Sequence, residues 1–267
     1  MARRSSAPDF IEALARGLDV IRAFSPGDGE IGLSAIAGRA GLARPTARRI
    51  LITLEEMGYV RAHEGSYALT PRVLELGMAY IQSQGLWPLF HPHLQELVRQ
   101  TNESCSIAQL DGSDIVYVAR VAVPKIVGLS VQIGTRFPAY ATSLGKALLA
   151  TLPPVQLEQV LDQPSRAQVT ARWQPTRDEI LRALDAVRER VWALTDEELA
   201  PGVRSVAVAL RNASGEAVAS VNVNASAAET SVAELVERYL PPLLATQGAI
   251  QADLARLYSL PVETVAR

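Results

Sequence analysis

Apolar side chains recur at helical spacing over the first sixty residues and are interrupted by turn residues. The pattern predicts three helices: one that ends after Ile21, a short one over residues 33–40 that stops at Gly41, and one from Arg44 to Gly58. Pro45 suits the start of the third helix, because the N–H that proline lacks is not needed there. The apolar stripes consist of Phe10, Ile11, Leu14, Leu18 and Ile21 in the first helix and of Ala47, Ile50, Leu51, Leu54 and Met57 in the third.

A short hairpin is predicted directly after the third helix. Residues 59–62 and 67–69 flank the glycine-containing turn His63-Glu64-Gly65-Ser66. Two short helices joined through a glycine, the second with a basic exposed N-terminal half, and then a small hairpin are the layout of a winged helix-turn-helix. The alternative interpretation is a plain three-helix bundle with a solvated basic face.

The winged layout points to double-stranded DNA as a partner, and the residue types fit that role. The first turns of a helix reach base edges in the major groove, where arginine bonds O6 and N7 of guanine as a fork. Threonine or backbone N–H groups hold phosphates. An arginine on the hairpin would meet the adjacent backbone or minor groove. The candidate DNA-contact residues are Arg44, Pro45, Thr46, Arg48 and Arg49 on the helix and Arg61 on the hairpin.

Beyond residue 70 the pattern predicts a linker helix that runs toward Gly85 and then a second domain. Strands are predicted over residues 105–110, 115–123, 126–133, 203–210 and 217–224, and helices from Pro88 to near Asn102 and over 143–150, 155–161 and 176–190. A long last helix has the stripe Val232, Leu235, Val236 and Tyr239. We therefore expect an α+β chain with a DNA-binding domain at 1–70, a linker helix at 71–86 and a second domain, with a mainly antiparallel sheet, at 87–260.

The last two predicted strands differ between their two faces. Val206 and Val208 share one face, whereas Ser205 and Ala207 share the other. On the partner strand, Asn222 and Asn224 project from one face together. Small side chains leave room and amides supply donors and acceptors, which suits a ligand cavity with a few placed polar groups. An ordinary solvated sheet face would give the same pattern.

The charge composition is informative only when the two parts of the chain are counted separately. The 267 residues carry 26 basic and 28 acidic side chains, and this net charge of −2 excludes a chain that grips polyanions over its whole surface. Residues 1–72, however, carry ten arginines against eight acids, whereas the rest carries 16 basic and 20 acidic residues. The single cysteine, Cys105, excludes an intramolecular disulfide and suits the cytoplasm. Because no apolar stretch reaches 18 residues, we expect no membrane span.

Three separate motifs resemble the IclR-type transcriptional regulators, over nearly the whole chain. They are Leu33-Ser34 with Gly41-Leu42-Ala43-Arg44-Pro45-Thr46 and the run 54–60, then Gly145-Lys146-Ala147-Leu148-Leu149-Ala150, then Asp196-Glu197-Glu198 with the run 202–207. The segment 134–146 is similar to the branch that controls aromatic degradation through protocatechuate and the β-ketoadipate pathway. The resemblance implies a winged helix-turn-helix, a GAF-like effector domain, and assembly as homodimers or dimers of dimers.

The resemblance also implies a site for a small organic acid, either an aromatic acid or one like β-ketoadipate. Carried over by position, the effector residues are Tyr140, Thr142, Ser143, Leu144, Asp196, Ser205, Asn222 and Asn224. Many relatives have cysteine at position 205 and Ser-x-Ser at 222–224, which makes a glyoxylate-type or pyruvate-type ligand a poorer expectation here. Arg136 or Arg204 could neutralise a carboxylate, although strand parity turns Arg204 away from Ser205.

A protein of a different class, an enzyme that turns over a small acid and uses its N-terminal domain for protein interaction, is the alternative. Against it, the sequence offers no set of nucleophile, base and orienting group. His91 and His93 diverge on a helix and have no accompanying thiol or carboxylate cluster, so no metal site is expected. We therefore expect a cytoplasmic, ligand-responsive regulator of a catabolic operon, with no catalytic residues and no cofactor.

Overall fold

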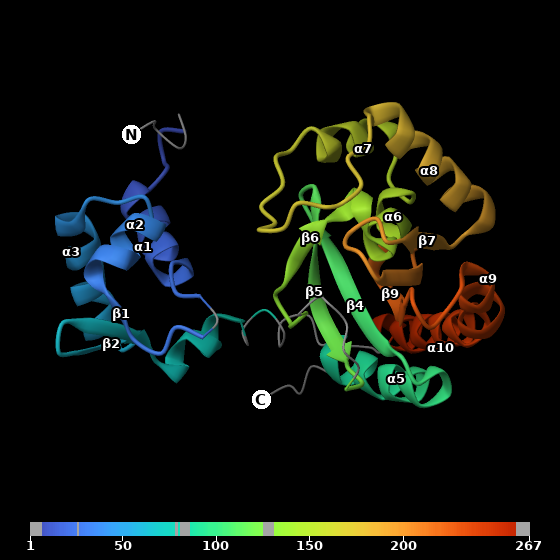
Figure 1. Ribbon diagram of the computed structural model, residues 1–267, viewed down its shortest axis with the longest axis horizontal. Coiled ribbons are helices and arrows are strands. Elements are labelled where there is room, and N and C mark those ends of the chain that lie inside the picture. Colours follow the sequence, from blue (N-terminus) through green and yellow to red (C-terminus); the bar gives the residue numbers. More distant parts are fainter. Residues whose placement is uncertain (1–6, 26, 78–79, 81–85, 125–130, 260–267) are drawn as a thin grey trace, which may run out of the picture. The chain divides into compact units, whose positions relative to one another are not determined.

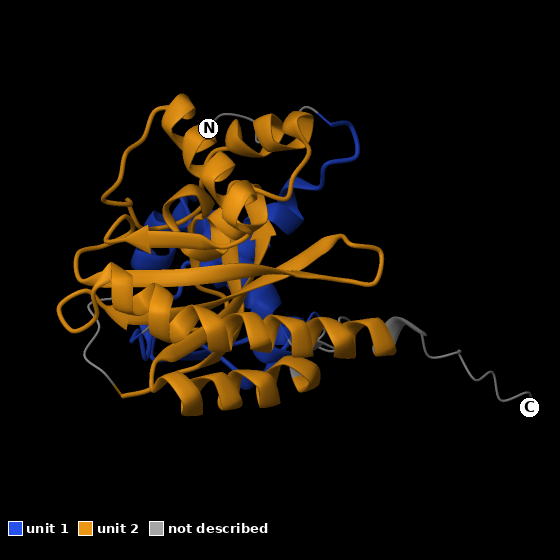
Figure 2. Ribbon diagram, turned by 90° about the vertical axis from the view of Figure 1, so that its right-hand side faces the viewer, with its two compact units in different colours: residues 1–83 blue, residues 84–267 orange. Residues whose placement is uncertain are grey.

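The computed structural model describes the chain except for residues 1–6, 26, 78–79, 81–85, 125–130 and 260–267. It contains two compact units, residues 1–83 and residues 84–267 (Figure 2). The division falls within the predicted linker helix at 71–86. Of that segment, Pro71–Val73 form a 3-10 turn and residues 74–77 are helical. Much of the remainder lies outside the described residues, so the linker helix and the domain boundaries stay predictions.

Up to residue 69, the described part of the first unit combines three helices with a small antiparallel sheet in the order β1-β3-β2 (Figure 1). Gly41 has a φ of +62°, a conformation that favours glycine, and it makes the sharp turn between the second and third helices. The predicted hairpin is present, and a two-residue strand that the sequence did not indicate pairs with it. The elements are α1 (Glu12–Arg22), β1 (Ile31–Gly32), α2 (Leu33–Arg39), α3 (Arg44–Glu56), β2 (Val60–His63) and β3 (Ser66–Leu69).

The core of the first unit is built mainly from α2 and α3. Ile36, Ala47 and Leu51 are fully or almost fully buried, as the spacing on α3 predicts. The first helix differs from expectation, because most of its apolar stripe, apart from the half-buried Ile21, is exposed in the unit. Leu14 and Leu18 keep 63% and 42% of their surface exposed, and Phe10 and Ile11 precede the helix and are exposed too.

The second unit is built on a six-stranded antiparallel sheet with the order β6-β5-β4-β9-β8-β7 (Figure 1). The predicted α+β class is confirmed. The strands are β4 (Ser104–Asp111), β5 (Asp114–Val121), β6 (Arg136–Pro138), β7 (Ala193–Asp196), β8 (Val203–Arg211) and β9 (Ala217–Ser226). The helices are α5 (Leu86–Thr101), α6 (Ser143–Leu149), α7 (Pro154–Leu161), α8 (Arg177–Arg190), α9 (Val232–Glu234) and α10 (Leu240–Ser259), with a π-helical turn at Leu235–Tyr239.

Helices cover both faces of this sheet, and the two faces have different chemistry. Val206, Val208 and Leu210 pack on one side with α5 and α10. Ala207 and Ala108 lie on the opposite side with α6, α7 and α8 (Figure 1). The alternation predicted for β8 is therefore confirmed, and its small-residue face lies inside the molecule.

Two details of the predicted strands require correction. The strand expected at 126–133 falls mostly outside the described residues, and residues 131–133 are not in a strand. The third strand of the meander is instead the short β6. The strand β7 was not predicted, because four residues after a helix give little alternation to detect. Among the helices that the structure describes, none has the length and apolar character that crossing a membrane requires.

Candidate functional site

The first candidate surface is the exposed N-terminal half of α3. Arg44 and Arg48 lie one helical turn apart and are both exposed, as are Pro45 and Arg49. No described residue forms an ion pair or hydrogen bond with the guanidinium of Arg44, Arg48 or Arg49. The residue before the helix is an alanine, so no side chain caps its first N–H groups. This arrangement leaves unpaired cations and backbone donors available to a polyanion.

The remaining DNA-contact candidates are positioned differently. Thr46 is half-buried and, like Arg49, lines a groove between α3 and α1. On the hairpin, Arg61 is exposed and its Nη2 lies 3.2 Å from Oε1 of Glu30. The structure thus brings Arg44, Pro45 and Arg48 to one exposed helix end and places Arg61 on a separate element with an acidic neighbour.

The second candidate site begins as two rows of polar residues across the central sheet of the second unit. In one row Thr195, Ser205, Asn224 and Ser104 are successive partners on β7, β8, β9 and β4. In the next row Asn222 pairs with Ser106, and Ser106 pairs with Arg120. Both rows lie on the small-residue face. Since Ser205 and Asn222 are 4% and 2% exposed, the solvated-face interpretation is wrong.

Three hydroxyl groups form a chain at one end of these rows. The Ser205 hydroxyl lies 2.7 Å from that of Ser143 and 2.8 Å from that of Thr195. Ser143 reaches this point because it is the first residue of α6. Thr142 caps this helix, with its hydroxyl accepting from the Gly145 N–H at 3.0 Å. A helix start and two strands therefore meet at one uncharged polar cluster.

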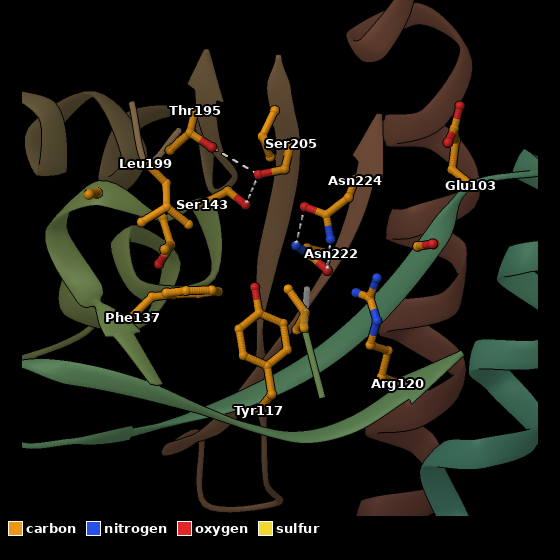
Figure 3. A pocket seen from close by; sticks show the side chains of 15 residues that line it. Glu103, Tyr117, Arg120, Phe137, Ser143, Thr195, Leu199, Ser205, Asn222 and Asn224 are labelled. Carbon is orange, nitrogen blue, oxygen red and sulfur yellow. Dashed lines mark hydrogen bonds between the residues drawn. The ribbon is translucent and has the colours of Figure 1, made fainter. Parts of the chain in front are cut away.

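The two asparagines join the sheet rows to one another. The Asn222 side-chain oxygen accepts from the Ser106 N–H at 3.1 Å, and its amide nitrogen donates to the Asn224 side-chain oxygen at 3.1 Å. Asn222 is thus held in one orientation by the backbone of the neighbouring strand. The amide groups lie next to the hydroxyl cluster in Figure 3.

A β-bulge places two further residues in the same region. Ile107 pairs with Ala119, but the next residue, Ala108, pairs with Tyr117, so one extra residue is accommodated on β5. Without the bulge, Tyr117 and Arg120, three positions apart, would point to opposite faces. With it, both side chains lie on the polar face.

Tyr117 brings a buried, neutral hydroxyl group. Its side chain is 4% exposed, and its ring meets that of Phe137 edge to face with centroids 5.7 Å apart. Burial raises the pKa of Tyr117 to about 12, so the phenol stays protonated near neutral pH. Within the described part of the chain its hydroxyl has no hydrogen-bond partner, and Figure 3 shows it directed toward the serines and asparagines.

Arg120 brings a positive charge. Its Nη1 donates to the Ser106 hydroxyl at 2.9 Å, and burial is the main influence that lowers the pKa of the guanidinium. Arginine starts so high that it stays protonated near neutral pH. No described carboxylate forms an ion pair with Arg120, so most of its N–H donors are available to a bound anion.

These groups line one cavity (Figure 3). The polar groups described above line it together with apolar side chains. The lining residues are Glu103, Ser104, Tyr117, Arg120, Val131, Phe137, Ala141, Thr142, Ser143, Thr195, Leu199, Val203, Ser205, Asn222 and Asn224.

Comparison with known proteins identifies the family. Residues 13–64 match the IclR helix-turn-helix domain, and residues 78–252 match the C-terminal domain of the bacterial transcriptional regulator IclR. The chain belongs to the IclR family of transcriptional regulators. Members of this family regulate transcription, which excludes the alternative of an enzyme.

Individual relatives refine this assignment. The chain is 36% identical over 239 residues to the Pca regulon regulatory protein of Pseudomonas putida, covering 89% of this chain and 82% of that protein. It is 45% identical to a putative transcriptional regulator, RHA06195, from Rhodococcus sp. RHA1, with a TM-score of 0.79 and coverage of 93% and 100%. An IclR homologue from Microbacterium hydrocarbonoxydans, complexed with 4-hydroxybenzoate, is 22% identical, with a TM-score of 0.77 and coverage of 91% and 99%, and shares the fold.

Within this IclR-family cavity the structure gathers only part of the predicted effector set. Thr142, Ser143, Ser205, Asn222 and Asn224 line it. Three predicted residues do not.

The three residues outside the lining each have another place. Tyr140 packs against the ring of Trp173 with centroids 6.1 Å apart. Leu144 is fully buried in the core between the sheet and α6. Asp196 is exposed and paired with Arg204, whose Nη2 lies 2.6 Å from its Oδ1. Arg204 is thus already neutralised within the chain.

Sequence reasoning missed several residues that this IclR-family cavity contains. They are Glu103, Tyr117, Arg120, Phe137 and Thr195, which come from β5, β6, β7 and the approach to β4. Arg136, the other carboxylate-binding candidate, pairs instead with Asp111, its Nη2 lying 2.5 Å from Oδ2. The alternation of side chains along β5 could have predicted that either Tyr117 or Arg120 faces the cavity, but not both. Both face it because of the β-bulge.

Proposed function

We propose that this protein is a cytoplasmic regulator that binds operator DNA through α3 and responds to a small organic acid held in the sheet cavity. The observation that carries the proposal is the pair of unpaired arginines, Arg44 and Arg48, on the exposed first turns of the helix-turn-helix unit. Family membership supplies the regulatory context. The proposal needs no cofactor.

In this proposal the arginines of α3 divide the work of DNA binding by position. Arg44 and Arg48 face outward together and reach base edges in the major groove. The first N–H groups of the helix, Thr46 and Arg49 contact phosphates, which fix the register of the helix on the duplex. Arg61, on the hairpin, contacts the DNA backbone beside the major groove. Its guanidinium then pairs with a phosphate instead of with Glu30.

The effector in this proposal is an acid whose carboxylate pairs with Arg120. The buried groups of Ser143, Ser205 and Asn222 orient the rest of the molecule by hydrogen bonds. A homologue of the same fold was solved with 4-hydroxybenzoate, which supports an aromatic acid as one ligand class. An aliphatic acid like β-ketoadipate is the other.

Two copies of the chain are proposed to act together on a two-fold symmetric operator. The exposed stripe of α1, with Leu14 and Leu18, continues into a groove in the same unit that also contains Met57. A stripe of this kind is buried most simply by the same stripe of a second copy. In such a dimer the two DNA-binding units can adopt one arrangement that fits the operator and another that does not. The acid alters DNA affinity only if it binds these two arrangements with different affinity.

An electrophoretic mobility shift assay tests the DNA-binding part of the proposal. Full-length protein is titrated into a duplex from the region upstream of its own gene, at low and moderate salt. Arg48→Ala is expected to weaken specific binding by about 1–3 kcal/mol, that is by a factor of about 5 to 150. Arg99→Ala, which removes an exposed arginine of α5, is the matched control and leaves binding unchanged. Equal affinity of the wild type and Arg48→Ala would overturn the assignment of α3.

A further inference from the structure

The side chains of α3 divide into three strips along the helix. One strip faces the core of the first unit and includes Ala47, Leu51 and Leu54. A second strip lines the groove beside α1 and includes Thr46, Arg49 and Thr53. A third strip is exposed and lines neither the core nor the groove. This outer strip consists of Arg44, Pro45, Arg48, Ile52 and Glu56.

Ile52 differs from the rest of the outer strip, because its side chain is large, branched and apolar. It keeps 37% of its surface exposed. Helical positions four apart lie on one face, so Ile52 continues the line that Arg44 and Arg48 begin. It lies about 140–160° around the helix axis from the buried Ala47 and Leu54, as 3.6 residues per turn require. Ile52 therefore points away from the core of the unit.

The groove beside α1 does not account for the exposure of Ile52. Exposed apolar side chains of the first unit gather in that groove, among them Leu14, Leu18 and Met57. Ile52 is not one of the residues that line it. A second copy of the chain that covers the stripe of α1 therefore leaves the surface of Ile52 to a different partner.

Charge complementarity identifies double-stranded DNA as that partner. Arg44 and Arg48 precede Ile52 on the outer strip, and no described carboxylate pairs with either guanidinium. The first N–H groups of α3 have no side-chain cap and attract the same polyanion. Glu56 ends the strip with a negative charge, which phosphates repel. Ile52 is thus the last position of the strip that DNA-bound α3 offers to a base.

An apolar side chain in the major groove has a matching group on one base, the C5 methyl of thymine. Isoleucine has no side-chain donor or acceptor. Against the polar edges of guanine, adenine or cytosine, it would displace water without replacing the lost hydrogen bonds. Against a methyl group, both apolar surfaces leave water, which is favourable. Ile52 therefore suits a thymine better than any other base.

Helix geometry places this contact relative to the arginines. Four residues of α-helix advance by about 6 Å, and successive base pairs are about 3.4 Å apart. Arg48 and Ile52 therefore reach base pairs that lie at most about two steps apart. A guanine bonded by Arg48 and a thymine beside Ile52 belong to one short sequence element.

We propose that Ile52 is a specificity-determining residue that recognises the C5 methyl group of a thymine in each operator half-site. The inference rests on the proposed DNA-binding function of α3. It adds an apolar contact that arginines do not provide, and it places the thymine close to the guanine bonded by Arg48. Deoxyuridine pairs as thymine does but lacks the methyl group, so it replaces this thymine only with a loss of affinity.

A scan of the operator with deoxyuridine tests this inference. Footprinting with the full-length protein first locates the bound site in the region upstream of its own gene. Duplexes that each carry one deoxyuridine in place of one thymine are then titrated by fluorescence anisotropy at one salt concentration. The wild type is expected to lose affinity about three- to fourfold at one thymine per half-site, which is the effect of one methyl group leaving an apolar contact.

Variants of the full-length protein assign the contact to Ile52. Ile52→Ala is expected to bind the thymine duplex and the deoxyuridine duplex equally at that position. Ile52→Val retains a branched apolar side chain and is expected to keep most of the preference for thymine. Val155→Ala, at an exposed apolar position on α7, is the matched control and keeps the full preference. Circular dichroism verifies that each variant is folded.

Three other results would overturn the inference, and they differ in what else they affect. Equal wild-type affinity for all the deoxyuridine duplexes would mean that no thymine methyl is recognised, while DNA binding by α3 stands. A full thymine preference in Ile52→Ala would assign the methyl contact to another side chain. If no footprint forms upstream of the gene even at low salt, the proposed DNA-binding function falls together with the inference.

Discussion

At the scale of single residues, Gly145 marks the tightest constraint on the cavity. It lies in the first turn of α6, and a Cβ at this position would lie 2.1 Å from the carbonyl oxygen of Ala139 and 2.4 Å from its Cα. Both are backbone atoms, which cannot rotate away. Only glycine therefore lets α6 approach the preceding turn closely enough to place Ser143 in the cavity.

Gly145→Ala is predicted to destabilise the second unit by about 1–3 kcal/mol or more, because helix and turn must separate. Urea denaturation followed by circular dichroism measures the effect. Gly248→Ala is the matched control, since this glycine of α10 has nothing within 4 Å of the added Cβ. The control is expected to be neutral or slightly stabilising. Equal midpoints for the two variants would contradict the close approach of α6.

Cys105 is predicted to be unreactive in the native protein. Burial raises the pKa of its thiol to about 12, so the thiolate is scarce at pH 8. A thiol-reactive chromogenic reagent should react slowly with native protein and quickly after denaturation. The raised pKa also means that the unfolded chain releases this proton first, so stability falls as pH rises from about 9 toward 12. Fast native labelling would contradict the burial of this thiol.

Residue-level prediction from the sequence succeeded where local pattern determines position. The alternation of Ser205 with Val206 correctly assigned their faces. Arg120 could not be assigned in this way, because its place depends on pairing with Ser106 and, through Asn222, with a strand more than a hundred residues away. The motif resemblance placed Asp196 in the cavity, but an ion pair with Arg204 holds it outside.

At the scale of elements, long periodic segments were predictable and short strands were not. The helices α2, α3, α6, α7 and α8 and the strands β4, β5, β8 and β9 lie close to their predicted ranges. The strands β1, β6 and β7 have two to four residues and exist because neighbouring strands offer unpaired edges, which is a tertiary effect. The helix α1 was predicted correctly, but most of its apolar stripe is exposed in the first unit.

The exposed stripe of α1 gives a prediction for this helix. Leu14→Glu is expected to shift the protein from dimer toward monomer, because it places a charge in the apolar surface proposed to pair with a second copy. Sedimentation velocity at several concentrations measures the change. Val155→Glu, at a similarly exposed apolar position on α7, is the matched control. An unchanged sedimentation coefficient for Leu14→Glu would show that this stripe is not the dimer contact.

At the scale of the whole molecule, the near-neutral net charge of −2 does not show that the two units differ in where their arginines lie. The first unit carries the unpaired arginines of α3, and the second places one arginine, Arg120, in the lining of its cavity. Averaged charge therefore said little about partners, whereas the regional arrangement of arginines agrees with the family assignment.

DNA binding in the presence and absence of a bound acid tests the central claim most directly. Fluorescence anisotropy of a labelled operator duplex is measured with and without saturating 4-hydroxybenzoate, for the wild type and for Arg120→Gln. The wild-type affinity is predicted to change by about fivefold or more, as a coupling of about 1 kcal/mol requires. Arg120→Gln is predicted to bind DNA without the acid and to lose the response. An unresponsive wild type, or an equal response from both proteins, would contradict the account.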